Sequence, residues 1–198
     1  MSRVYTLLFD GYADWELGHV LAELRRHGKV EVVTVGFSDK TVTSMGGLRV
    51  IPDKSIAEID IQDLLIFIIP GGYMWEGSYP KNEIERLLHR LEDAQKPIAA
   101  ICAATTVLAR AGLLKDRKHT SNSLSYLSTM VPEYTDNANY ISALAIRDQH
   151  IITASGLGSI EFTMEIFSEL NLAAPEMLAI WYDAFKHGKF PENIEQGT

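Results

Sequence analysis

The single cysteine of the chain, Cys102, occupies a position from which a thiol can act as a nucleophile. The apolar residues 97–101 before it predict a strand, and residues 103–108 after it predict a helix. A tight turn between them places the sulfur over the helix N-terminus, where unpaired N–H groups and the helix dipole favour a thiolate. Free cysteines are also among the most buried residues in proteins, so a purely structural role is the alternative.

Two other strand ends carry groups that could assist such a thiol. Glu16 lies at the start of a helical stretch, where its carboxyl could hydrogen-bond the sulfur and exchange a proton with it. The pair Gly71-Gly72 follows an apolar strand and could bring backbone N–H groups close to a developing oxyanion. Both features have plainer explanations, because an acidic first turn complements the helix dipole and paired glycines make tight turns.

The elements that must position these residues alternate between strand and helix. The predicted strands cover 4–9, 30–37, 64–69, 98–101, 140–147 and 151–154, the last two as a hairpin. The predicted helices cover 14–27, 80–91, 103–113, 159–170 and 175–186. Residues 38–63 are mixed, with short strands expected on either side of Gly46-Gly47.

This alternation predicts an α/β fold, a flavodoxin-like three-layer sandwich with a mostly parallel sheet and helices on both faces. We expect one domain that spans residues 1–198. Ligands of open parallel sheets bind at the carboxyl ends of the strands. The segments 10–16, 70–76 and 155–158 should therefore meet Cys102 at one edge of the sheet.

The composition excludes several classes of protein. A formal net charge of −8 argues against nucleic-acid binding, which depends mainly on Lys and Arg. One cysteine excludes an internal disulfide, and the apolar runs are too short for a signal peptide or a membrane span. We therefore expect a cytoplasmic protein that binds no membrane. The chain has no CxxC or HExxH motif and no dinucleotide fingerprint, so we expect neither a metal nor a cofactor.

Taken together, the motifs resemble those of the ThiJ/PfpI family, within the class I glutamine amidotransferase-like superfamily. They are Asp14-Trp15-Glu16, Pro70-Gly71-Gly72, Ala100-Ile101-Cys102-Ala103 and Ala154-Ser155-Gly156, and the resemblance covers roughly residues 3–170. It implies a flavodoxin-like sandwich, usually a homodimer, with a reactive cysteine at Cys102. It also implies that Glu16 is a protonated glutamate that hydrogen-bonds the sulfur, and that the N–H groups of Gly72 and Ala103 form an oxyanion site.

The chain departs from the family pattern in its histidines. The protease-like members have a histidine directly after the cysteine, where this chain has Ala103. Other members have one about twenty residues further on, where this chain has Asn122; His119 lies three residues earlier and is expected to be structural. The chain also lacks the late His-x-Glu pair of the glutamine amidotransferases. Protease and glutaminase activities are therefore disfavoured.

Several side chains near these junctions could line a pocket. Trp15 and Trp75 could exclude water from the cysteine, although ordinary core packing or a dimer contact would explain them equally well. Asn122 and Ser155 are expected at the same edge of the sheet.

Two functions from different classes fit this pattern. The first is a cofactor-independent cysteine hydrolase or lyase that acts on a small carbonyl, amide or nitrile-like substrate, with Cys102 as nucleophile and Glu16 as proton shuttle. The second is a redox-responsive stress protein in which Cys102 is oxidised rather than catalytic.

Overall fold

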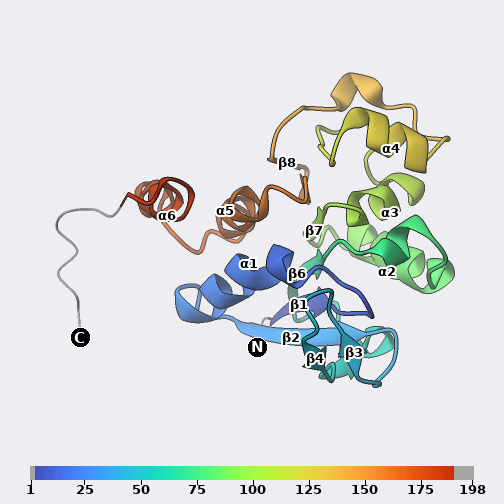
Figure 1. Cartoon of the computed structure of the whole chain (residues 1–198), viewed down its shortest axis with the longest axis horizontal. Coiled ribbons are helices and arrows are strands. Elements are labelled where there is room, and N and C mark those ends of the chain that lie inside the picture. Colours follow the sequence, from blue (N-terminus) through green and yellow to red (C-terminus); the bar gives the residue numbers. More distant parts are fainter. Residues whose placement is uncertain (1–2, 190–198) are drawn as a thin grey trace.

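Seven strands form the central sheet of the computed structural model, which describes residues 3–189 (Figure 1). Their order is β5-β2-β1-β6-β7-β9-β8, and every neighbouring pair is parallel except β8 with β9. The strands are β1 (Arg3–Leu7), β2 (Glu31–Gly36), β5 (Lys54–Ser55), β6 (Leu64–Ile69), β7 (Ile98–Ile101), β8 (Ala145–Asp148) and β9 (Ile151–Ala154). Two further short strands, β3 (Val42–Thr43) and β4 (Arg49–Val50), form a separate hairpin.

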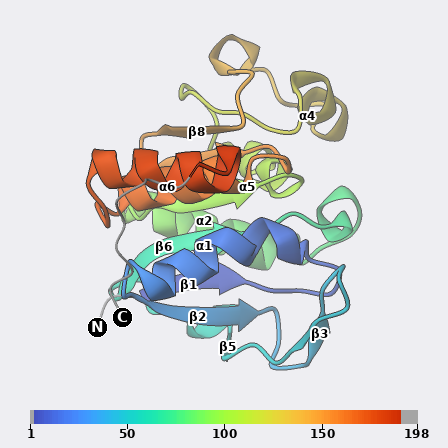
Figure 2. The same ribbon diagram turned by 60° about the vertical axis from the view of Figure 1, so that its left-hand side comes forward.

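Helices cover both faces of the sheet. On one face α1 and α5 lie side by side with α6 outside them, and α2 and α3 lie on the other (Figures 1 and 2). The helices are α1 (Asp14–Arg26), α2 (Lys81–Asp93), α3 (Ala104–Arg110), α4 (Leu124–Met130), α5 (Ser159–Glu169) and α6 (Pro175–His187). Short 3₁₀ turns, η1 (Ile56–Glu58), η2 (Tyr73–Glu76) and η3 (Asn137–Asn139), complete the elements. The predicted α/β sandwich with a mostly parallel sheet is confirmed.

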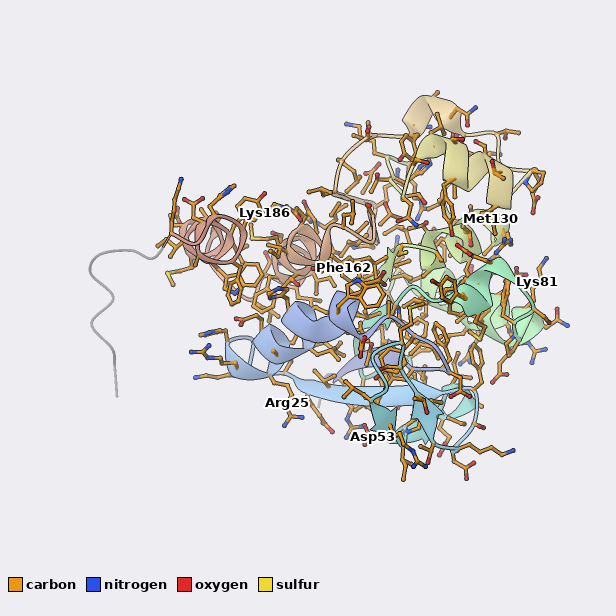
Figure 3. The ribbon with its side chains drawn as sticks, in the orientation of Figure 1. Arg25, Asp53, Lys81, Met130, Phe162 and Lys186 are labelled. Carbon is orange, nitrogen blue, oxygen red and sulfur yellow. The ribbon has the colours of Figure 1, made fainter. Side chains whose placement is uncertain are left out.

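The core explains why these segments form these elements. The sequence of β6 is Leu-Leu-Ile-Phe-Ile-Ile, which suits a strand covered by helices on both faces, and five of its six residues are buried. Helix α2 buries Ile84, Leu87, Leu88 and Leu91, which share one face at helical spacing. In Figure 3, Phe162 of α5 points into the interior, whereas Arg25 and Lys81 point outward.

The strand register brings the carboxyl ends of the central strands together. Ile69 of β6 pairs with Ala100 of β7, and Ile101 of β7 pairs with Ala154 of β9. The residues that follow these strands, Gly71, Cys102 and Ser155, are therefore neighbours at one edge of the sheet, as the parallel arrangement predicts.

The structure differs from the sequence-based prediction at several places, among them the first strand, which was expected over 4–9 and ends at Leu7. Residues 140–144 are not part of the hairpin, because β8 begins at Ala145 and Tyr140 instead pairs with His119 in an isolated bridge. Helix α3 ends at Arg110 rather than 113, since Gly112 has a φ of 73° that no helix residue adopts. Helix α4 was not expected at all; the Ser123 side chain caps it by accepting from the Tyr126 N–H at 2.9 Å.

The helices among residues 3–189 are too short or too polar to cross a membrane. These residues also contain no cluster of three or more His, Cys, Asp or Glu side chains that could hold a metal ion.

Candidate active site

Cys102 lies in the turn between β7 and α3 with a φ of 60°, a left-handed value that is uncommon for a residue with a side chain. Its N–H donates to the carbonyl of Ala154 at 2.8 Å, which extends the β7–β9 pairing by one residue. A backbone of this kind costs about 1–3 kcal/mol and persists only where the surrounding structure fixes it. The turn therefore holds the partly buried sulfur in one place.

Glu16 lies in the first turn of α1 and is completely buried, so it is not a solvated first-turn glutamate. The start of the helix is tied to the end of β6 because the Ala13 N–H donates to the Gly71 carbonyl at 3.0 Å. In return the Gly71 N–H donates to Oε2 of Glu16 at 2.6 Å. Burial raises the pKa of Glu16 to about 7, against the opposing effect of the Gly71 N–H. This carboxyl can therefore gain or lose a proton near neutral pH.

The carboxyl of Glu16 and the sulfur of Cys102 face the same small space. A methyl group placed on Gly156 would lie 2.9 Å from Sγ and 3.2 Å from Oε1 of Glu16. One placed on Gly71 would lie 2.7 Å from Cβ of Cys102 and 2.8 Å from Oε2 of Glu16. Within residues 3–189, Oε1 of Glu16 has no hydrogen-bond partner. A free carboxyl oxygen is thus held next to a thiol, and two glycines leave the room for it.

The prediction that the Cys102 thiol has a lowered pKa is wrong. Burial and the charge of the Glu16 carboxylate raise the pKa of Cys102 to about 11. Two donors act in the opposite direction: the Asn122 amide, whose Nδ2 lies 3.3 Å from Sγ, and the Ala103 N–H. They do not overcome the burial, so the sulfur needs a base to take its proton. Glu16 is the carboxyl in position to do so.

The predicted oxyanion donors are only partly available. The Gly71 N–H is already used by Glu16, so it is not free for a substrate. The Ala103 N–H points at the sulfur, and within the described chain the Gly72 N–H has no hydrogen-bond acceptor. Gly72 is the next residue after the glycine that packs against Cys102. These two N–H groups are the ones that an anion formed beside the sulfur could use.

Asn122 and Ser155 line a pocket of about 540 Å³ beside the cysteine. Asn122 is anchored there because its Oδ1 accepts from the Gly156 N–H at 2.9 Å while its Nδ2 donates to the sulfur. Asn122 therefore contacts both this pocket and the thiol, whereas Cys102 itself does not line the pocket.

The model of the DJ-1/PfpI family matches residues 2–169, nearly all of the sandwich described above. The chain belongs to this family. The resemblance inferred from the motifs is therefore confirmed.

Members of the DJ-1/PfpI family share both sequence and fold with this chain. The "Uncharacterized protease YoaZ" of Bacillus subtilis is 37% identical over 197 residues, which cover 94% of this chain and 92% of the relative. "Deglycase TK1284" of Thermococcus kodakarensis is 30% identical over 119 residues, 60% of this chain and 71% of the relative. The crystal structure of the DJ-1 superfamily protein Atu0886 from Agrobacterium tumefaciens has a TM-score of 0.85 and 35% identity, with coverage of 94% and 100%.

This DJ-1/PfpI chain uses its histidine near Asn122 for structure rather than for the site. His119 is completely buried, its Nε2 lies 2.6 Å from the Tyr134 hydroxyl and its Nδ1 lies 2.8 Å from the Arg117 carbonyl. Both ring nitrogens are therefore occupied away from the sulfur. Asn122, and not a histidine, touches Cys102.

The two tryptophans predicted to wall the pocket lie elsewhere. Trp75 is completely buried in the core, where its Nε1 donates to the Pro70 carbonyl at 2.8 Å and its ring packs against Phe9. Trp75 therefore stabilises the turn after β6 from the core. Trp15 is 56% exposed and is not among the residues that line the pocket.

One contact near the site was not predicted. The Tyr126 hydroxyl on α4 donates to Oε1 of Glu76 at 2.8 Å and so joins α4 to the turn after β6. Burial, the hydrogen bond to Glu76 and the charges of Glu76 and Cys102 raise the pKa of Tyr126. Ser123, a serine three residues before Tyr126, was the available sequence signal for the start of this helix.

Substitution of Gly71 by alanine should close the space between the thiol and the carboxyl. The added methyl would overlap Cys102 and Glu16, and overpacking of this kind costs about 1–3 kcal/mol of stability. Gly18→Ala is the matched control, because Gly18 lies inside α1 with no atom near its missing Cβ, so alanine should stabilise the chain by about 0.5–1 kcal/mol. Urea unfolding measures whether Gly71→Ala lowers the free energy of unfolding and Gly18→Ala raises it. A Gly71→Ala protein as stable as the parent would contradict the close approach of Gly71 to Cys102 and Glu16.

Proposed function

We propose that this chain is a cysteine-dependent enzyme in which Cys102 attacks the electrophilic carbon of a small carbonyl, amide or nitrile-like substrate. The observation that carries the proposal is the free Oε1 of Glu16, which faces the same space as Sγ. A carboxylate with a pKa near 7 can accept a thiol proton at neutral pH and return it later.

The attack on a carbonyl follows from this arrangement. The Cys102 thiol gives its proton to Glu16 while its sulfur forms a bond to the carbonyl carbon, and the π electrons of the carbonyl move to the oxygen. The Gly72 and Ala103 N–H groups can hold the resulting oxyanion. For an aldehyde, Glu16 returns the proton to that oxygen, which gives a hemithioacetal that reverts by the same steps. For an amide, Glu16 gives the proton to the nitrogen that leaves. A thioester formed in the second case is hydrolysed by water.

The names of the relatives do not agree on one reaction, since they include a protease and a deglycase. Our proposal therefore assigns the attacking atom and the proton carrier, which several reactions share. Glu16 serves as both base and acid, because His119 is fully engaged by Tyr134 and Arg117.

The alternative, a redox-responsive protein, is less well supported. Oxidation by peroxide proceeds through the thiolate, and the raised pKa of Cys102 keeps the sulfur protonated at neutral pH. The same property suits an enzyme with a neighbouring base.

A reversible block of the single thiol tests the proposal. The protein is incubated with a primary amide and a nitrile, whose loss is followed by NMR, and with a ¹³C-labelled aldehyde, whose hemithioacetal carbon is followed by the same method. Methyl methanethiosulfonate should abolish turnover when intact mass shows Cys102 fully converted to its methyl disulfide, and dithiothreitol should restore it. Turnover that survives complete blocking would rule out Cys102 as the nucleophile.

A further inference from the structure

The pocket beside Cys102 has an unusual lining for a catalytic protein. It measures about 540 Å³, within the size range of small-molecule sites. Four serines line it, and none of the described lining residues is Asp, Glu, Lys, Arg or His. Its polar groups are thus hydroxyls and one amide rather than charges.

The serine hydroxyls differ in the hydrogen bonds that they already make within the protein. Ser121 Oγ is paired with Thr105 Oγ1 at 2.7 Å. Ser123 and Ser155 each accept one hydrogen bond, from the N–H groups of Tyr126 at 2.9 Å and Leu157 at 3.3 Å.

A serine hydroxyl that accepts in this way still has its own O–H to donate. Within residues 3–189, no hydrogen bond takes up the O–H of Ser123 or Ser155, and Ser142 makes no side-chain hydrogen bond. Three hydroxyls therefore remain to bind a ligand.

Apolar side chains supply the rest of the wall. Leu124, Leu144 and the Tyr140 ring alternate with the hydroxyls around the pocket. A ligand with hydroxyl groups on a carbon skeleton presents both kinds of surface. A phosphate or a carboxylate, by contrast, would meet no opposite charge among the described lining residues.

The pocket and the reacting sulfur have Asn122 as a common neighbour, although Cys102 itself does not line the pocket. Asn122 lines it and donates to Sγ at 3.3 Å, and Ser155 precedes Gly156, the glycine that leaves room beside the sulfur. Resting on the proposed function, we infer that this pocket selects uncharged, hydroxylated carbonyl compounds and holds their hydroxyl groups with Ser123, Ser142 and Ser155.

Three aldehydes with the same carbon skeleton test the selection: glyceraldehyde, propanal and glyceraldehyde 3-phosphate. An aldehyde has no leaving group, so the reaction measured is formation of the reversible hemithioacetal with Cys102. We expect its association constant for glyceraldehyde to exceed that for propanal by about fivefold per hydroxyl bound, and that for the phosphate by about tenfold or more. Ser142→Ala and Ser155→Ala should each lower the ratio of the glyceraldehyde value to the propanal value about fivefold. Ser125→Ala is the matched control, because Ser125 is exposed on α4 and does not line the pocket.

A binding measurement separates this inference from the proposed enzyme activity. Saturation-transfer NMR on the Cys102→Ser protein reports which aldehyde the pocket holds when no thiol can react. Preference for glyceraldehyde there, with loss in Ser142→Ala, supports the selection even if blocking Cys102 leaves turnover intact. Equal binding of all three compounds, or a preference for the phosphate, overturns the inference even if turnover depends on the thiol.

Discussion

Cys102→Ala should lower turnover by roughly 10³-fold or more, the largest effect that we expect from any single substitution. The sulfur is the only thiol of the chain, and it faces the same space as the free Oε1 of Glu16. Cys102→Ser should lose nearly as much, because a hydroxyl in the same place is far less acidic than a thiol. Substrate loss followed by NMR, with the substrate found in the blocking experiment, measures both.

The backbone of Cys102 requires a second control. Alanine at a φ of 60° keeps the strain of the turn, whereas glycine relieves it. Cys102→Gly should therefore be more stable than Cys102→Ala by about 1 kcal/mol in urea unfolding, and equally inactive. If the glycine variant recovered activity, the loss in the alanine variant would be a folding effect and the sulfur would not be the nucleophile.

The sequence predicted secondary structure best in segments whose own residues determine it. The bounds of β6 and β7 agree with the prediction to the residue, because each is an uninterrupted apolar run that ends at the sheet edge. The order of the junctions then followed from the parallel sheet. That order is enough to bring Glu16, Gly71 and Cys102 together, which the structure also does.

Properties that depend on the whole environment were harder to predict. The direction of the Cys102 pKa shift depends first on the burial of the thiol and then on the charge of Glu16, which the chain brings to it from a distant segment. The expectation that a helix N-terminus lowers a thiol pKa considers only the local segment, so it does not account for these two effects. The same holds for Trp75, whose spacing suits a pocket wall and a core position equally well until packing decides.

Glu16→Gln should lower kcat/KM by about 10²–10⁴-fold, the usual contribution of a positioned acid or base. The parent protein should lose activity about tenfold per pH unit below pH 7, where Glu16 is protonated and cannot accept the thiol proton. The variant should lack this limb in its pH profile. Glu23→Gln is the matched control, because Glu23 is also buried on α1 and contacts His27 rather than the site.

The same substitution should change stability with a defined sign. The pKa of Glu16 is about 7 in the fold and 4.5 as a free side chain, so between these values the unfolded chain binds fewer protons than the native one. Stability of the parent therefore falls as pH rises from about 4.5 to 7, by roughly 3 kcal/mol at 1.36 kcal/mol per pH unit. Glutamine does not titrate. Urea unfolding should show that the free energy of unfolding of Glu16→Gln rises relative to that of the parent between pH 4.5 and 7. Above pH 7 the difference between the two proteins should stay constant.

Alkylation of the thiol separates a proton carrier from a merely structural carboxyl. The Glu16 carboxylate raises the pKa of Cys102, so its removal should lower that pKa and speed the reaction with iodoacetamide at pH 8, read by intact mass. Turnover should slow in the same variant. Opposite changes in the two rates are expected only if Glu16 takes the proton during catalysis. If both rates fell together, Glu16 would be holding the turn in shape, and if neither changed, the carboxyl would have no part in the reaction.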